Sequence, residues 1–160
     1  MKENRLAFLK SAFPKHQIKF SEDCSNATIV NPNYDENITV YDEGYEYIAC
    51  FSFQHRHLDD AESVVAWSRD IMTGQLFAIE FFREGRRCFG SEIEAGELQE
   101  LTYEKLEQFT GQFGLTKLFS VADTCKVRGW DSQQNFDASF VRESNGCGTI
   151  KKMWGVDGSD

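Results

Sequence analysis

The feature that most constrains the fold is residues 46–93, where the hydrophobic pattern changes from strand-like to helix-like and back. Apolar and polar residues alternate through residues 45–53, which is the pattern of a half-buried strand. A helical pattern follows, and then residues 75–83, a run so apolar that it predicts a well-covered strand. Residues 84–85, Glu-Gly, form a two-residue hairpin signal. Such a unit can bury a core, and it contains no recognisable catalytic motif.

The helical part of this unit carries signals for both of its ends. The first strand is expected to end at residues 54–57, and Asp59 is expected to cap the helix, with Glu62 three residues further on. Gly74 stands where a left-handed residue commonly ends a helix. The apolar residues recur at helical spacing and predict one buried face, formed by Ala61, Val64, Val65, Ile71 and Met72.

The flanking segments add a helix at residues 3–13 and short strands at residues 18–20, 27–31 and 38–41. After the central unit, Thr102 is expected to cap another helix. The shared apolar face of that helix is formed by Tyr103, Leu106, Phe109 and Phe113.

The end of the chain completes the predicted fold. Residues 118–127 and 136–141 have the pattern of strands, and residues 144–160 are predicted to be a C-terminal tail, partly mobile. The sequence therefore predicts a single α+β domain over residues 1–143, with a mainly antiparallel sheet and about three helices packed on it. Its core is expected where the central helix crosses the sheet, formed by Phe51, Val64, Ile71, Ile79 and Phe81.

The charge of the chain limits the classes of partner. Its 160 residues carry a net charge of −9, whereas nucleic acids and anionic membranes require a basic surface, so neither is an expected partner. A basic protein remains a suitable partner. No stretch reaches the roughly 18 apolar residues of a membrane-spanning helix, and no secretory signal is recognised. Five cysteines without metal-binding spacing fit a reducing cytoplasm, and no cofactor is expected.

Two histidines are the first candidates for chemistry. His55 and His57 are two residues apart, and in a strand both side chains point to the same side, where they could bind one metal ion. Asp59 or Asp60 could add a carboxylate, but Asp59 is expected to cap the helix, and Arg56 places a positive charge between the rings. We therefore predict hydrogen-bonded or solvated histidines and no metal site. A metal-dependent hydrolase that uses both histidines is the alternative.

An acidic segment follows the predicted hairpin, with six glutamates and a single lysine in residues 92–107. Glu100, Glu104 and Glu107 have the spacing of one helical stripe if the helix starts early enough to include Glu100, and like charges on such a stripe cost roughly a few tenths of a kcal/mol per pair. A stripe that repels itself suits a cationic partner, and a solvated face is the other interpretation. An exposed aromatic residue is a common interface anchor. The predicted partner-binding residues are therefore Glu94, Glu97, Glu100, Glu104, His55, His57 and Trp130.

Part of the chain resembles small bacterial immunity-type proteins of polymorphic-toxin and contact-dependent inhibition systems. In that pattern an aromatic strand ends in a Trp-His-x-His-type motif, an acidic-capped helix follows, and a Gly-x-hydrophobic strand leads into a basic hairpin. The chain departs from the pattern at Gln54, where tryptophan is expected. The resemblance implies a cytoplasmic protein that binds and blocks a cognate toxin, and it assigns no catalytic residues. It covers residues 47–90, with matches at residues 53–57, 58–60, 70–74 and 78–85.

The residues and the resemblance favour the same function. We expect a binding protein, not an enzyme, that neutralises a cognate bacterial toxin by covering its active cleft. A basic, nuclease-like toxin suits an acidic inhibitor, because complementary charges speed association. The alternatives are the metal-dependent hydrolase and a structural or regulatory domain whose acidity serves only solubility.

Overall fold

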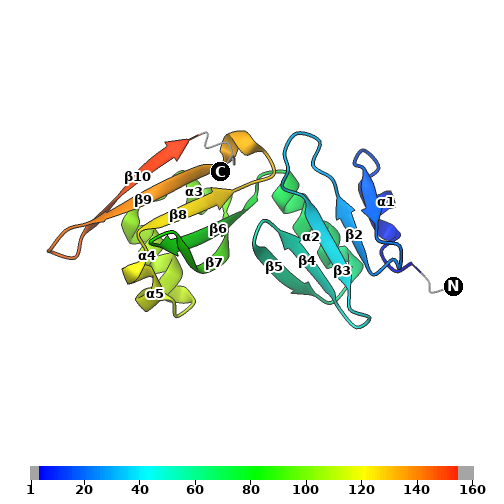
Figure 1. Ribbon diagram of the computed structural model, residues 1–160, viewed down its shortest axis with the longest axis horizontal. Coiled ribbons are helices and arrows are strands. Elements are labelled where there is room, and N and C mark those ends of the chain that lie inside the picture. The colour runs from blue at the N-terminus through cyan, green and yellow to red at the C-terminus, as the bar shows by residue number, and fades with distance from the viewer. Residues whose placement is uncertain (1–3, 155–160) are drawn as a thin grey trace.

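The computed structural model describes residues 4–154, which form two antiparallel sheets of five strands each (Figure 1). The strands are β1 (Ile18–Phe20), β2 (Asn26–Ile29), β3 (Ile38–Asp42), β4 (Tyr47–Phe51), β5 (Gln54–Leu58), β6 (Leu76–Arg83), β7 (Arg86–Glu94), β8 (Thr124–Arg128), β9 (Phe136–Arg142) and β10 (Gly148–Trp154). The helices are α1 (Phe8–Ala12), α2 (Ala61–Met72), α3 (Ala95–Gln99), α4 (Tyr103–Gln112), α5 (Thr116–Val121) and the 3-10 helix η1 (Ser132–Gln134).

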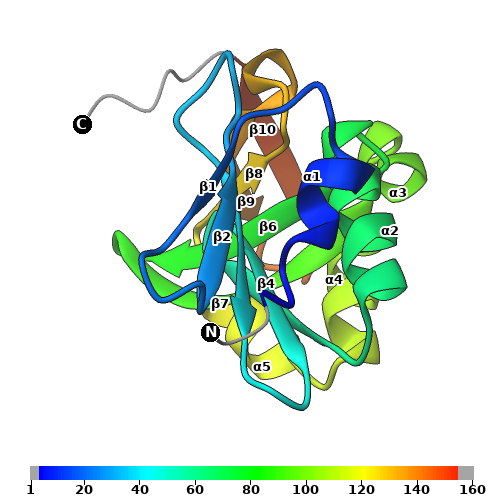
Figure 2. The same cartoon turned by 90° about the vertical axis from the view of Figure 1, so that its right-hand side faces the viewer.

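The predicted α+β class is confirmed, with a different division of the strands. The N-terminal sheet has the order β1-β2-β3-β4-β5 and the C-terminal sheet the order β10-β9-β8-β6-β7, so two sheets stand where the sequence predicts one. The described residues hold five α-helices rather than about three. α1, α2, α3 and α4 lie on one side of the two sheets (Figure 2). None of the helices within residues 4–154 is long and apolar enough to cross a membrane.

Residues 54–57, predicted as the end of a strand, belong to a separate strand. β4 ends at Phe51, and a tight turn at Ser52 and Phe53 reverses the chain, with Ser52 in the left-handed conformation at φ 53°. β5 then pairs with β4 along its whole length. β5 could not be recognised from the sequence, because it is an outermost strand in which only Leu58 is buried. Its residues therefore show no alternation of apolar and polar types.

The central helix α2 has its predicted end but a different cap. Asp60, not Asp59, is the N-cap, and its Oδ1 atom accepts a hydrogen bond from the Ser63 N–H at 2.7 Å. The helix ends before Gly74, whose φ of +69° is the left-handed conformation predicted for it. α2 packs on the N-terminal sheet through Val64, Trp67 and Ile71.

The strand predicted over residues 118–127 is wrong in its first half. That half lies in α5, and β8 begins only at Thr124. Phe119 and Ala122 are buried in the C-terminal core at a helical spacing. Leu118 and Val121 are exposed, so they give the segment an apolar composition without belonging to the core.

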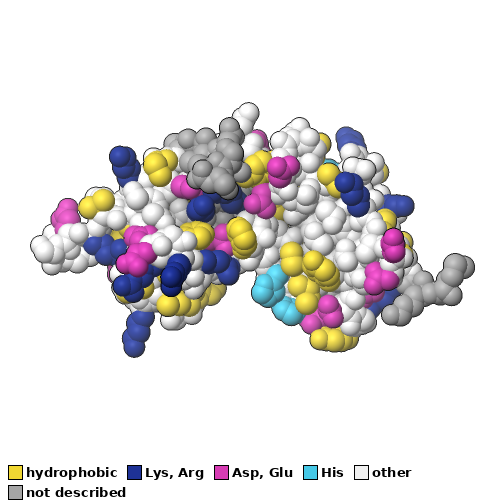
Figure 3. All heavy atoms as spheres, viewed as in Figure 1, with side chains coloured by type: hydrophobic (Ala, Val, Ile, Leu, Met, Phe, Trp, Pro, Cys, Tyr) yellow, Lys and Arg dark blue, Asp and Glu magenta, His cyan; other side chains and the backbone are white. Residues whose placement is uncertain are grey.

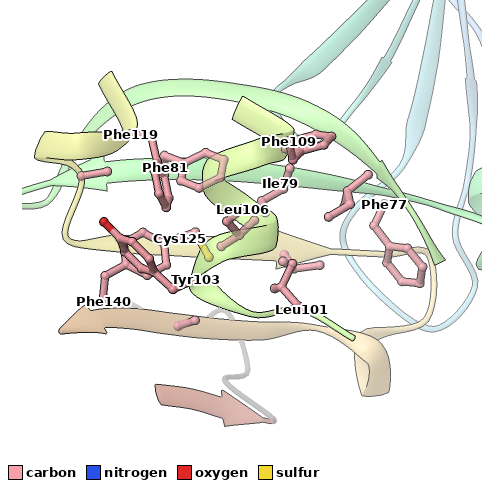
Figure 4. Packing of buried hydrophobic residues seen from close by; sticks show 14 of the residues in the cluster. Phe77, Ile79, Phe81, Leu101, Tyr103, Leu106, Phe109, Phe119, Cys125 and Phe140 are labelled. Carbon is pink, nitrogen blue, oxygen red and sulfur yellow. The ribbon is translucent and has the colours of Figure 1, made fainter. Parts of the chain in front are cut away.

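The hydrophobic core is divided between the two sheets. All five residues predicted to form one core are buried, but Phe51, Val64 and Ile71 pack in the N-terminal half. Ile79 and Phe81 pack in the C-terminal half, with aromatic rings from α4, α5 and β9 (Figure 4). The predicted single cluster is wrong because β6 belongs to a different sheet from β4.

Part of the predicted C-terminal tail is a strand. β10 pairs with β9 from Gly148 to Trp154, within residues 144–160 that the sequence assigns to a tail. Gly148 is buried against the ring of Tyr103, and a Cβ atom at residue 148 would come within 2.5 Å of that ring. The remainder of the predicted tail, residues 155–160, lies outside the described residues.

Replacing Gly148 with alanine is expected to lower the free energy of unfolding by about 1–3 kcal/mol through overpacking. The Tyr103 ring cannot easily move aside, because Arg142 Nε donates a hydrogen bond to its hydroxyl oxygen at 2.7 Å. Urea unfolding measures the change. Gly96→Ala is the control, since a Cβ atom at residue 96 meets nothing within 4 Å. If both variants are as stable as the wild type, β10 does not pack against α4.

Candidate functional site

The two sheets approach each other at their outermost strands, β5 and β7, and a groove of about 640 Å³ lies beside this junction. We call it the inter-sheet groove. It brings together three of the predicted partner-binding residues, His55, Glu94 and Glu97. The complete lining is Gln54, His55, Arg56, Leu76, Gly90, Ser91, Glu92, Glu94, Glu97, Phe109, Gln112 and Phe113.

Glu92 joins the two halves of the molecule at this groove. Its Oε1 atom accepts a hydrogen bond from Trp67 Nε1 at 2.7 Å, and its Oε2 atom lies 3.1 Å from Arg56 Nη1. The elements α2, β5 and β7 therefore meet at one carboxylate. Because Arg56 offsets the charge of Glu92, the unpaired negative charge of the groove comes from other residues.

Glu94 and Glu97 supply that charge. Glu94 is the N-cap of α3, and its backbone N–H donates to the Glu97 carboxylate at 3.4 Å, in the reciprocal arrangement of a capping box. Both residues are exposed. The local contact at the start of α3 thus holds two carboxylates side by side at the groove.

The other two predicted glutamates lie outside the groove lining. Glu100 follows α3 and forms an ion pair with Lys105, and Glu104 lies in the first turn of α4. The condition for a helical stripe of Glu100, Glu104 and Glu107 is not met, because α4 begins at Tyr103 and includes only Glu104 and Glu107. A smaller hollow of about 290 Å³ shares part of its lining with the groove and includes Lys105. Glu100 and Glu104 are both exposed, so they extend the acidic surface from the end of α3 to the first turn of α4.

His55 and His57 lie on the outer face of the N-terminal sheet, with ring centroids 5.5 Å apart. His55 also lines the groove, while the Nδ1 atom of His57 lies 3.0 Å from a carboxylate oxygen of Glu46. Figure 3 shows histidine beside hydrophobic side chains on this face, and Phe53 in the adjoining turn is 67% exposed. Within residues 4–154, no three His, Cys, Asp or Glu side chains are arranged to hold a metal ion.

Trp130 lies apart from the groove. It is half-buried at the N-terminal core, where its ring centroid is 6.3 Å from that of Phe51 and 6.0 Å from that of His16. Its carbonyl oxygen accepts a hydrogen bond from Asn31 Nδ2 at 2.7 Å. These contacts give Trp130 a role in packing. It does not line the groove with the predicted partner-binding residues His55, Glu94 and Glu97.

Phe113 belongs to the groove, although the sequence predicts it on the buried face of its helix. It is 56% exposed and lines the groove, and its ring meets that of Phe109 edge-on with centroids 5.2 Å apart. The cause is the end of α4 at Gln112, after which Gly114 turns the chain with φ of +70°. The glycine is the signal in the sequence that Phe113 has left the helix.

Gln54 is a second groove residue, which the sequence marks only as a position where tryptophan is expected. Its Nε2 atom is buried and has no hydrogen-bond partner within residues 4–154. Gly90 of β7 leaves the space for this amide, since a Cβ atom at residue 90 would overlap it. β5 and β7 can therefore approach closely at this point only because residue 90 has no side chain.

Buried charges lie at the same junction. Glu80 is 1% exposed, and its Oε1 atom accepts a hydrogen bond from Arg87 Nε at 2.6 Å. Glu36 lies near Glu80 and beside Ser52. Burial raises the pKa of both glutamates. A nearby positive charge partly opposes the rise, chiefly that of Arg87 at Glu80 and that of Arg128 at Glu36. This cluster of Glu36, Glu80 and the arginines beside them could not be recognised from the sequence, because Glu80 stands within an apolar run.

The Glu36→Gln change is expected to alter how stability depends on pH. Because the pKa of Glu36 is raised in the folded state, its contribution to stability falls as the pH rises from about 4.5 through the raised pKa. Glutamine removes that loss, so the variant should gain stability relative to the wild type between pH 4.5 and pH 7. Urea unfolding across this range measures the difference. A difference that does not change with pH would contradict the burial of Glu36 as a charged group.

The inter-sheet groove presents carboxylates, an imidazole and an exposed aromatic ring, a set suited to a cationic surface. Lysine and arginine side chains can pair with the carboxylates of Glu94 and Glu97, and their aliphatic stems can lie along Phe113. Comparison with known protein families, with curated proteins and with solved structures found no match to this chain.

Proposed function

We propose that this protein is an inhibitor of the immunity type, which binds a basic protein toxin and covers its active cleft. The observation that carries the proposal is the inter-sheet groove, where Glu94 and Glu97 are exposed beside His55 and Phe113. Carboxylates attract a cationic partner during approach, and an aromatic ring anchors it after contact. A nuclease-like toxin binds phosphates through a basic cleft, so an acidic inhibitor can occupy the same cleft.

The framework of the groove supports tight binding. Glu92 ties β7 to Trp67 of α2 and to Arg56 of β5, so the walls are fixed by contacts between separate elements. The capping box at Glu94 and Glu97 fixes the acidic wall. Groups that are already ordered lose less conformational entropy when a partner binds. The inhibitor therefore needs little rearrangement to present its charges.

The resemblance of residues 47–90 to immunity-type proteins supports the choice of a toxin as the partner. These residues build β4, β5, α2, β6 and the first half of β7. They include Gln54, His55 and Arg56, which form the β5 wall of the groove. The resemblance and the groove thus involve the same part of the chain.

The test is co-purification of this protein with the C-terminal domain of a large secreted protein encoded beside its gene, followed by an assay of that domain's toxicity. We expect a stable one-to-one complex and loss of toxic activity. If the wild-type protein forms no complex with this domain and gives no protection, the proposal is wrong.

Phe113→Ala is expected to weaken the complex by about tenfold or more, because exposed aromatic anchors carry much of the binding energy of an interface. Isothermal titration calorimetry with the toxin domain measures the change. Tyr45→Ala is the matched control, since Tyr45 is an 80% exposed aromatic residue in the turn between β3 and β4, outside the groove. Equal losses for the two variants would remove the groove from the interface.

A further inference from the structure

A second hollow lies beside the inter-sheet groove, between α3 and α4, and has a volume of about 290 Å³. We call it the helix pocket. It shares Glu97, Phe109 and Gln112 with the groove, so a partner that lies in the groove can reach it. Pockets for small-molecule ligands usually exceed about 300 Å³. The helix pocket therefore has the size for one long side chain of a protein partner.

The floor of the helix pocket is apolar. It is formed by Ile93 of β7, Leu101 between the two helices and Phe109 of α4, each at most 7% exposed. Gly96 of α3 also lines the pocket, and a Cβ atom at residue 96 would meet nothing within 4 Å, so the pocket is open at this position. A side chain that enters the pocket must place apolar atoms against the floor, because apolar surface is most stable away from water.

The rim of the helix pocket is polar, and the charge that is not offset there is negative. Glu97 is exposed, and the capping-box bond that its Oε2 atom accepts leaves most acceptor sites of the carboxylate for a ligand. Gln108 and Gln112 lie one turn apart on α4 and add two exposed amides. Lys105 also lines the pocket, but its ion pair with Glu100 offsets its charge. A side chain with an apolar stem and a cationic end fits this lining.

Arginine meets these requirements better than lysine. Its stem can lie on the apolar floor while its charged end stays at the rim. The planar guanidinium group carries five N–H donors, so it can pair with both oxygens of a carboxylate and still donate to a neighbouring amide. Lysine ends in a compact, strongly hydrated ammonium group instead. Glu97 and the amide oxygens of Gln108 and Gln112 therefore supply the acceptors that a guanidinium group uses.

We infer that the helix pocket receives one arginine side chain of the partner, with its stem on Leu101 and Phe109 and its guanidinium group at Glu97. The inference rests on the proposed function, because it names the anchor of a basic partner that occupies the neighbouring groove. Arginine is one of the residue types enriched among the few that carry most of the binding energy of an interface. Other cationic residues of the partner then meet Glu94, while this one fixes the position of the complex.

The probe is N-acetyl-arginine N-methylamide, compared with the corresponding citrulline and lysine derivatives. Citrulline keeps the shape of arginine but is neutral, and lysine keeps the charge but lacks the planar fork. Two-dimensional proton–nitrogen NMR of the full chain measures each dissociation constant and locates the residues whose signals move. We expect signals of residues 96–97 and 108–109 to move. Arginine should bind about fivefold or more tightly than citrulline and about threefold or more tightly than lysine.

Two glutamate variants separate the helix pocket from the rest of the acidic surface. Glu97→Gln removes the carboxylate at the rim and should abolish the preference for arginine over citrulline, while glutamine can still complete the capping box. The matched control, Glu104→Gln, removes one charge from an exposed residue in the first turn of α4, outside the pocket lining, and should bind all three probes as the wild type does. Equal losses in the two variants would show attraction to net charge and would overturn the inference.

A toxin complex extends the test to the partner itself. Replacing the exposed arginines of the toxin domain one at a time with lysine should find one whose change weakens the complex by about tenfold or more. In the Glu97→Gln variant the same change should have a much smaller effect, because both changes then act on one contact. A complex in which no arginine behaves in this way would overturn the inference.

Failure of the inference and failure of the proposed function give different results. Absence of arginine binding, signal changes away from the helix pocket, or equal affinity for arginine and either other probe would overturn the inference, while a toxin complex would still support the proposed function. Arginine binding at the helix pocket without a toxin complex would retain the pocket and reject the toxin as its partner.

Discussion

Ile79→Ala is expected to lower the free energy of unfolding by about 2–5 kcal/mol. Ile79 is fully buried on β6, between β7 and β8, and its side chain lies near Leu106 and Phe109 of α4 (Figure 4). The change removes apolar area from the core and leaves a cavity. The surrounding side chains, many of them aromatic, are closely packed and cannot fill it. Urea unfolding followed by far-ultraviolet circular dichroism measures the loss.

The matched control is Val141→Ala, another aliphatic truncation in a strand of the same sheet. Val141 is 56% exposed on β9, so its change should stay within about 0.5 kcal/mol of the wild type. A loss below about 1 kcal/mol for Ile79→Ala would mean that residue 79 does not face the core. The pairing of β6 would then be displaced by one residue, which moves every side chain of the strand to the opposite face.

The hairpin of β6 and β7 could be predicted from the sequence because its signals are local. Glu84 and Gly85 both take the left-handed conformation, at φ 50° and 75°, as a two-residue turn of this kind requires. The same holds for α4, whose Thr102 cap accepts a hydrogen bond from the Lys105 N–H as expected. Each of these features depends on residues within a few positions of one another.

The division into two sheets could not be predicted in the same way, because it depends on residues far apart in the chain. Ala78 of β6 pairs with Arg128 of β8, fifty residues later. No local pattern in the sequence indicates that β5 is the last strand of one sheet and that β6 belongs to another. β10 was concealed by a further effect, since Lys151 and Lys152 give it the composition of a solvated tail although it pairs with β9.

The candidate site shows the same limit. The acidic segment was visible in the sequence, but the groove exists because Gln54 and Gly90 meet across two sheets. Glu92 belongs to the same acidic segment, yet Trp67 and Arg56 occupy its carboxylate. The sequence therefore shows which residues are charged, whereas the tertiary contacts decide which of these charges remain available to a partner.

Changing Glu94, Glu97, Glu100 and Glu104 together to glutamine is expected to slow association with the basic toxin domain by about tenfold or more, with a smaller effect on dissociation. Long-range attraction acts on the approach of the two proteins, while exposed ion pairs add little to the bound state. Association of the wild type should also slow as salt rises past about 0.15 M, where the screening length falls to about 8 Å. Stopped-flow fluorescence measures the rates.

The control changes Glu22, Glu43, Glu62 and Glu143 to glutamine, which removes the same net charge from exposed positions outside the groove. Glutamine can still complete the capping box at the start of α3, so both variants should remain folded, which urea unfolding verifies. If only the first variant associates slowly, the acidic surface beside the groove guides the partner. If neither variant differs from the wild type, that surface is solvated, and the outer face around Phe53, His55 and His57 becomes the candidate interface because its aromatic side chain is exposed.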